Sequence, residues 1–155
     1  MIATVAAIIS YVPIGILSGK IGRKKTILIG VCGLAFGFMV CGLLQQVSFL
    51  AKIMLGIVGI SWAAINVNSF PMVVEIASDG DEGKFTGYYY SFSMAAQILT
   101  PILSGAFLQY VSYKALFPYA VFFAIIAFFT MLKVKHGDVV QVSDKSMLEH
   151  FDVDS

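Results

Sequence analysis

Apolar segments long enough to cross a lipid bilayer recur along nearly the whole chain, and this feature constrains the fold most. About 30 Å of hydrocarbon is spanned by roughly 20 mostly apolar helical residues. Five such helices are predicted, at residues 2–19, 26–44, 49–77, 86–110 and 115–132. A soluble domain is about a quarter charged, whereas this chain is 59% hydrophobic and 12% charged. The sequence therefore predicts an all-α polytopic membrane protein, with its transmembrane bundle within residues 1–135.

The distribution of lysine and arginine predicts the orientation of this bundle. If each helix crosses once, the loops at 19–25 and 77–84 and the segment after 132 share one side. That side holds Lys20, Arg23, Lys24, Lys25, Lys84, Lys133 and Lys135, whereas the opposite turns hold Lys52 and Lys114. Because cytoplasmic loops carry the excess of positive charge, we expect a multi-pass plasma-membrane protein with a cytoplasmic C-terminus. The polar residues 136–155 are predicted to form a flexible cytoplasmic tail.

Several function classes find no support in the sequence. It contains no nucleophile with a base, no carboxylate pair within a predicted helix and no phosphate-binding glycine loop, so we do not expect an enzyme. A net charge of +1 without a broad basic tract argues against nucleic acid as a partner. Two cysteines and two histidines show no metal-ligand spacing, so neither a metal nor another cofactor is expected.

Small residues at helical spacing predict where the helices pack. Lipid tails are as apolar as leucine, so membrane helices associate through close packing of small side chains and through hydrogen bonds. Steps of four residues join Gly15 and Gly19 in the first helix, Gly33, Gly37 and Cys41 in the second, and Ala96, Thr100 and Ser104 in the fourth. Residues 120–129 are instead apolar all round, which predicts a lipid-facing position for the fifth helix.

The third predicted helix is polar on two sides. Ser61, Asn68 and Glu75 repeat every seven residues on one face, and Trp62, Asn66 and Ser69 lie on another. Polar residues within a membrane helix usually face a partner or a water-filled cavity. One side is therefore predicted to line a cavity and the other to bond a neighbouring helix. For either asparagine, both roles stay open at this point.

Two prolines are predicted to kink their helices. Pro71 cannot donate a hydrogen bond to the carbonyl of Val67, so a bend and a free acceptor are expected beside both asparagines. Such a bend serves either packing or the movement of a half-helix. The fourth helix repeats the arrangement, with Gln97 four residues before Pro101.

Charged residues at the cytoplasmic ends of two helices predict a contact between them. Glu75 ends the third helix, while Arg23 and Lys24 precede the second on the same side. We expect Glu75 to pair with Arg23, with Lys24 beside it, as a gate that latches the cytoplasmic ends. A solvated carboxylate at the interface, of little energetic consequence, is the alternative.

The segment from Gly15 to Thr26, GILSGKIGRKKT, resembles the loop signature of the major facilitator superfamily, roughly G-x-x-x-D-R-x-G-R-R. Both signature glycines, Gly15 and Gly22, and its basic run are kept, but Gly19 and Lys20 replace the aspartate and arginine. Residues 75–90 and 100–108 resemble the tenth loop and eleventh helix of that family. The resemblance implies helices eight to twelve of a twelve-helix fold, an incomplete six-helix half lacking the N-terminal helices of the same transporter.

Residues 59–75 and 87–105 most resemble the sugar and proton symporter branch, which includes the sucrose carriers. The resemblance implies that the tenth and eleventh helices border the cavity while the ninth and twelfth face lipid. It implies substrate contacts at Trp62, Asn66, Asn68 and Gln97, and amide and indole groups suit a sugar. The expected function is proton-coupled sugar symport by alternating access. A truncated non-transporting membrane fragment and a drug or metabolite exporter remain alternatives.

Overall fold

The computed structural model describes residues 1–44, 48–77 and 81–135. Its elements are α1 (Ile2–Ile21), α2 (Arg23–Leu43), α3 (Phe49–Val74), α4 (Glu82–Tyr110), the short 3₁₀ helix η1 (Tyr113–Ala115) and α5 (Leu116–Lys133). All regular structure within these ranges is helical. Each of the five long helices is long and apolar enough to cross a membrane. The predicted all-α polytopic fold with five transmembrane helices is confirmed.

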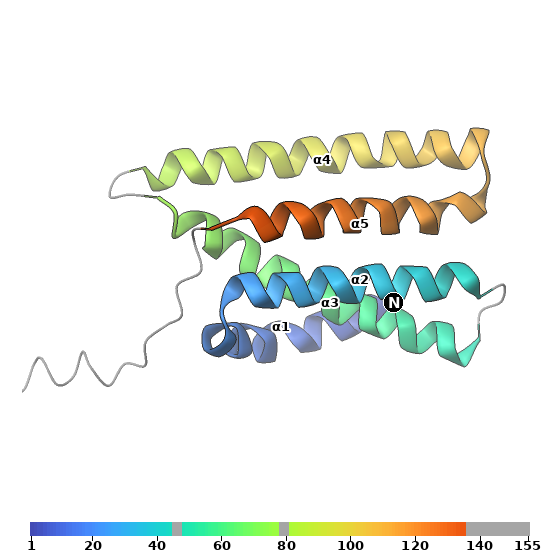
Figure 1. The fold of residues 1–155 in the computed structure, drawn as a ribbon, viewed down its shortest axis with the longest axis horizontal. Coiled ribbons are helices and arrows are strands. Elements are labelled where there is room, and N and C mark those ends of the chain that lie inside the picture. The colour runs from blue at the N-terminus through green and yellow to red at the C-terminus, as the bar shows by residue number, and fades with distance from the viewer. Residues whose placement is uncertain (45–47, 78–80, 136–155) are drawn as a thin grey trace, which may run out of the picture.

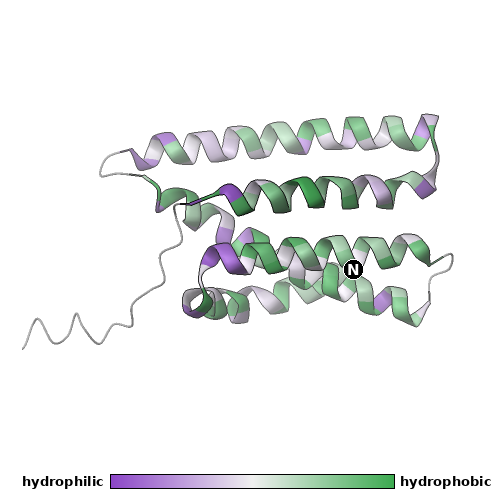
Figure 2. Cartoon of the chain, in the orientation of Figure 1, coloured by the Kyte–Doolittle hydropathy of each residue, from purple (hydrophilic) through white to green (hydrophobic). Residues whose placement is uncertain are grey.

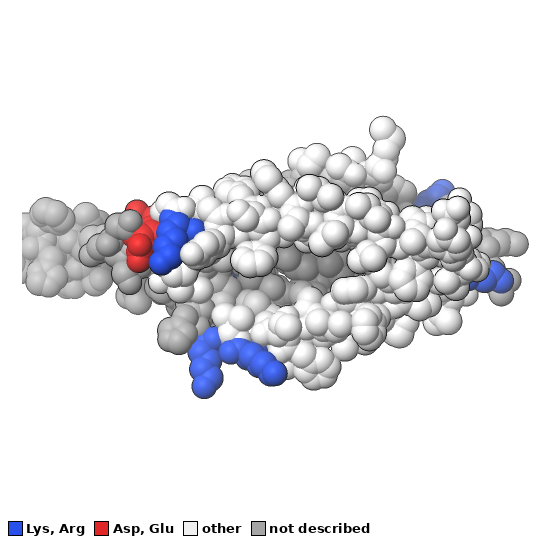
Figure 3. Space-filling view, turned by 90° about the horizontal axis from the view of Figure 1, so that it is seen from above, with Lys and Arg blue, Asp and Glu red and all other residues white. Residues whose placement is uncertain are grey.

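The five long helices lie side by side and alternate in direction (Figure 1). One end of the bundle brings together the ends of α1, α3 and α5 and the starts of α2 and α4. We call it the cation-rich end, because it carries the seven lysines and arginines that the sequence predicts on one side. Apolar residues dominate the middle of the helices (Figure 2), and on the face seen in Figure 3 the charged side chains gather towards the two ends. This is the charge pattern of a bundle that crosses a bilayer.

A single residue, Gly22, connects α1 to α2. Its φ of 96° lies in the left-handed region that favours glycine. The Gly22 amide donates to the Ser18 carbonyl at 3.0 Å, and the Thr26 hydroxyl donates to the Gly22 carbonyl at 2.9 Å. The connection is therefore shorter than the predicted loop over residues 19–25, because the two helices extend two and three residues further into it. Lysine and arginine are good helix formers, so both helices continue until the glycine reverses the chain.

The core of the molecule lies where α3 contacts α2 and α1. Glycines at this contact allow the helix backbones to approach each other closely. A Cβ added to Gly30 would lie 2.8 Å from the Ser61 carbonyl oxygen, and one on Gly37 would lie 2.6 Å from a Val58 methyl group. The predicted ridge on α2 thus packs directly against α3. We call Gly30, Gly33 and Gly37 the glycine seam. On the other side, a Cβ on Gly59 of α3 would collide with the backbone of Ala3 in α1.

The remaining two helices lie outside this core. α5 packs along α2, where Ala124, Phe128 and Met131 cover Ile27 and Val31. One side of α5 is therefore covered, and α2 lies between α3 and α5. The prediction that α2 and α5 face lipid therefore does not apply to the sides on which they contact each other. Exposure of their other sides to lipid stays a prediction.

α4 buries none of its side chains against the described helices. Aromatic rings hold it near both ends: Phe70 of α3 lies 5.5 Å from the ring of Tyr89, and Phe107 lies 5.0 Å from the ring of Tyr119 in α5. Between these contacts, the predicted ridge of small residues (Ala96, Thr100 and Ser104) is exposed or half-buried. This ridge has no partner among the described helices.

Candidate functional site

One polar side of α3 is packed into the core. Ser61 and Asn68 are buried, with exposed fractions of 6% and 1%. Ser61 lies under Gly33 of the seam, and the Asn68 amide donates to the Ala64 carbonyl of its own helix at 2.8 Å. We call Ser61 and Asn68 the packed side of α3. The position of Asn68 fits the packing alternative better than the predicted contact with substrate.

The other polar side of α3 is open. Trp62 is 54% exposed, and Asn66 is half-buried one turn further along the helix. The Asn66 amide donates to the backbone carbonyl of Trp62 at 2.9 Å, which holds the amide against its own helix. We call Trp62 and Asn66 the open side of α3. The structure thus brings these two predicted substrate contacts together and separates Asn68 from them.

A pocket of about 440 Å³ adjoins Trp62. It lies between α1, α2 and α3, and its lining consists of Ala3, Thr4, Ala7, Ile8, Tyr11, Leu34, Phe38, Val58, Gly59 and Trp62. The lining is almost wholly apolar, and Thr4 and Tyr11 contribute its two side-chain hydroxyl groups. Asn66 lies outside this lining. Trp62 therefore connects an apolar pocket to a polar amide.

Gln97, the fourth predicted substrate contact, lies on α4. Its side chain is exposed, and its amide donates to the Ser93 hydroxyl of the same helix at 3.2 Å. Gln97 follows Tyr89 by about two helical turns, so it lies on the stretch of α4 between the two aromatic contacts. The face seen in Figure 3 is hollowed midway along the helices.

Both prolines lie within continuous helices. α3 runs past Pro71 to Val74, and α4 runs past Pro101 to Tyr110. The asparagine amides bond the carbonyls of Trp62 and Ala64, so neither fills the acceptor that was expected at Val67. The kinks stay predictions.

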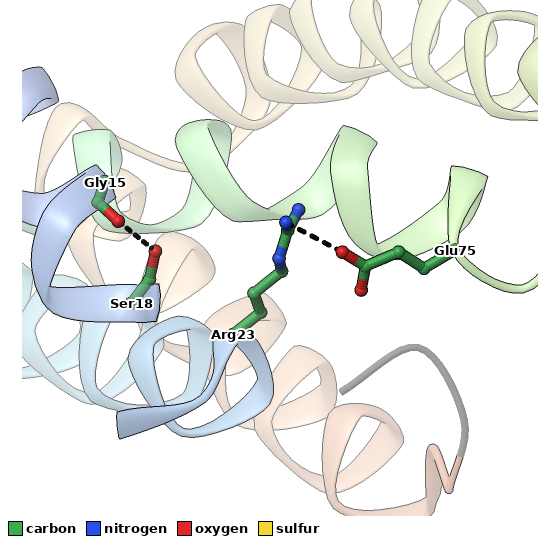
Figure 4. Close-up of polar contacts among 4 residues, drawn as sticks. All are labelled: Gly15, Ser18, Arg23 and Glu75. Carbon is green, nitrogen blue, oxygen red and sulfur yellow. Dashed lines mark hydrogen bonds and ion pairs between the residues drawn. The ribbon is translucent and has the colours of Figure 1, made fainter. Parts of the chain in front are cut away.

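At the cation-rich end, Arg23 and Glu75 form an ion pair (Figure 4). Arg23 Nη2 lies 2.7 Å from Glu75 Oε1, and the side chains are 17% and 24% exposed. Arg23 begins α2 directly after Gly22, and Glu75 directly follows the last residue of α3. The pair therefore joins two helices that the glycine seam already holds together. Its opening during transport stays a prediction.

Lys24 reaches a different helix. Its ammonium donates to the carbonyls of Leu132 at 3.1 Å and Val134 at 2.6 Å, at the end of α5. A cation at a helix C-terminus satisfies carbonyls that lack a partner within the helix and interacts favourably with the helix dipole. Sequence reasoning missed these acceptors because backbone carbonyls leave no mark in the sequence. Arg23 and Lys24 together fasten the ends of α3 and α5 to the start of α2.

Comparison with known proteins agrees with this architecture. The model of the Major Facilitator Superfamily matches residues 1–149. The chain belongs to the major facilitator superfamily. This is a family of membrane transporters, and with its five apolar helices the chain is a multi-pass membrane protein in contact with lipid.

Two relatives are uncharacterized MFS-type transporters of Mycobacterium tuberculosis, from strains CDC 1551 / Oshkosh and ATCC 25618 / H37Rv. Each is 27% identical to this chain over 100 residues, which are 64% of this chain and 14% of the relative. The matched region is thus a small part of these longer proteins.

Proposed function

We propose that the chain forms helices eight to twelve of a secondary transporter that moves a sugar together with protons across the plasma membrane. The observation that carries this proposal is the open side of α3, where an exposed indole and an amide lie one turn apart. Polyhydroxyl ligands need neutral donors and acceptors beside an aromatic face, which Asn66 and Trp62 supply. The described acidic residues, Glu75, Asp81 and Glu82, all belong to the cation-rich end, so a neutral substrate fits the open side best.

In this proposal the packed side of α3 has a structural role and the open side binds the substrate. The packed side and the glycine seam form a rigid scaffold, and the Arg23–Glu75 pair latches its cytoplasmic end. The missing N-terminal helices of the same transporter cover the exposed ridge of α4, and Gln97 adds an amide to the cavity. The coupling acid lies on those helices, and alternating access moves the scaffold as one body against the other half.

Transport by the complete protein tests this function. Vesicles containing it should accumulate a labelled disaccharide under a proton gradient and lose it when a protonophore is added. Asn66→Ala should raise the KM about fivefold, the cost of a hydrogen bond of about 1 kcal/mol. Trp62→Ala, which removes the aromatic face, should raise the KM by about the same factor. Thr130→Ala, whose hydroxyl bonds the Ala127 carbonyl on exposed α5, is the matched control. An absence of proton-driven uptake across the common sugars would contradict the proposal.

The apolar pocket beside Trp62 favours a second function, the export of a lipophilic compound. Pockets for such ligands are mostly apolar with few polar groups, as this lining is. In the same vesicles, a lipophilic fluorescent dye would then be expelled. Trp62→Ala should weaken this export while Asn66→Ala leaves it unchanged, because only Trp62 lines the pocket. The two substitutions therefore distinguish the functions.

A further inference from the structure

A second pocket shares Phe38 with the pocket beside Trp62, but its other lining residues are different. It lies between α2 and α5 near the end opposite the cation-rich end, with a volume of about 380 Å³. Its lining is Phe38, Met39, Gly42 and Leu43 from α2 and Phe117, Pro118, Val121, Phe122 and Ile125 from α5. We call it the α2–α5 groove. Its eight side chains are apolar and its ninth residue is a glycine, so no side chain of the lining offers a hydrogen-bonding group to a polar solute.

Close packing of one pair of residues gives the groove a floor. A Cβ on Gly42 would lie 2.8 Å from the Cβ of Phe117, so the two helices touch there. The rim is open, with Leu43 76% and Phe122 59% exposed. From Phe117 to Ile125 the helix rises about 12 Å, close to the hydrocarbon depth of one leaflet, about 15 Å. The groove thus has the length and polarity of a membrane-embedded acyl chain segment.

The charge next to the groove is positive. Lys114 lies in η1, three residues before Phe117, and is exposed. Lys52 occupies the same end of the bundle, whereas the acidic residues in the described part of the chain all belong to the other end. Lys114 stands at the depth where a phosphate group would lie if the acyl chain filled the groove.

We propose that the α2–α5 groove binds an anionic phospholipid, with an acyl chain between Gly42 and Ile125 and the phosphate at Lys114. In the membrane this apolar face is surrounded by lipid hydrocarbon. The positive charge of Lys114 then favours lipids whose head group carries a net negative charge. The electrostatic attraction between one lysine and anionic lipid is worth about 1 kcal/mol. This free energy favours the binding of an anionic over a zwitterionic lipid about fivefold. This site is separate from the open side of α3, so its failure would leave the transport proposal untouched.

Photolabelling of the full chain in nanodiscs tests the site. Diazirine-bearing phosphatidylglycerol and phosphatidylcholine are incorporated at equal mole fraction, and labelled peptides are mapped by mass spectrometry. Phosphatidylglycerol should label residues 38–43 and 117–125 about fivefold more than phosphatidylcholine does. Lys114→Gln should bring this ratio to about one, whereas Lys52→Gln should leave it unchanged. Equal labelling by the two lipids in the unaltered chain would overturn the proposal.

A bulky side chain that fills the groove provides a second test of lipid binding. Val121→Trp should remove most labelling from the groove segments, whereas Ile126→Trp, on α5 but outside the lining, should not. If the Val121→Trp variant does not fold, Lys114→Gln still tests the proposal, because Lys114 is exposed and its substitution should not disturb folding. If Val121→Trp instead alters the oligomeric state while labelling stays unchanged, the groove is a helix contact and the proposal is wrong.

Discussion

The α2–α3 contact and α4 carry the same pattern of small residues and yet have opposite surroundings. On α2, the glycine seam lies against Ser61 and Val58 at distances that leave no room for a Cβ. On α4, the described helices bury none of the small residues of the ridge that starts at Ala96, and a Cβ on Gly105 would meet nothing within 4 Å. A small-residue ridge therefore marks a surface suited to a helix, but it does not say whether this chain supplies that helix.

The same contrast separates the two polar sides of α3. The packed side, with Asn68, is buried against α2, whereas the open side, with Trp62 and Asn66, stays exposed or half-buried among the described helices. Transporters need both properties, because a rigid half moves as one body while its exposed side changes partners. We propose that α1–α3 and α5 form the scaffold and that further helices of the transporter cover the binding surface.

Adding a methyl group to a glycine should give the largest difference in stability between the packed core and α4. Gly59→Ala places its Cβ against the Ala3 backbone and should lower the free energy of unfolding by about 1–3 kcal/mol. Gly105→Ala is the matched control on α4, where the open space predicts no loss and a gain of up to about 1 kcal/mol. Denaturant titration of the chain in bicelles measures both. Equal losses would mean that α4 is packed as tightly as the core.

Substituting each of the two asparagines should show the same difference in stability between the packed and the open side of α3. Asn68→Ala removes a buried amide and should cost about 1–1.5 kcal/mol of stability, as hydrogen bonds in membrane helices do at their strongest. Asn66→Ala should change stability by less than about 0.5 kcal/mol, because its side chain is partly exposed. The same titration gives both values, and a larger loss for Asn66 would reverse the assignment of the two sides.

The ion pair should contribute less to stability than the buried amide of Asn68. A double-mutant cycle on Arg23 and Glu75 should yield a coupling free energy of about 1 kcal/mol, since both side chains are partly exposed. Lys84→Glu, at the start of α4, is a control without an expected effect.

In the complete protein, exchanging the charges of Arg23 and Glu75 should preserve transport, while either single reversal should impair it. Equal damage from all three variants would show that the pair is no latch.

Much of the fold follows from local pattern. Length and polarity identify the five membrane helices, and the spacing of charges places Arg23 and Glu75 at one end. The single-residue connection at Gly22 was missed, because a basic sequence between two apolar segments fits a polar loop as well as two helix ends. The glycine seam was found only in part, since Gly30 falls outside the four-residue steps that reveal Gly33 and Gly37.

The site was less predictable because it depends on neighbours distant in the sequence. The period of seven separates Asn68 from Asn66, but only the arrangement of α1 and α2 decides which side they cover. Lys24 bonds backbone carbonyls near Leu132, more than a hundred residues away. Gln97 lies on a helix whose middle has no described neighbour, so its surroundings depend on chain segments beyond those described.

Cysteine accessibility tests the division of α3 most directly. In the complete transporter, with Cys32 and Cys41 replaced by alanine, Asn66→Cys and Asn68→Cys are each exposed in membrane vesicles to a charged thiol reagent. We expect that the cysteine at position 66 is labelled, that the transported sugar protects it, and that the cysteine at position 68 is not labelled. Labelling at position 68 with sugar protection, and none at position 66, would contradict it.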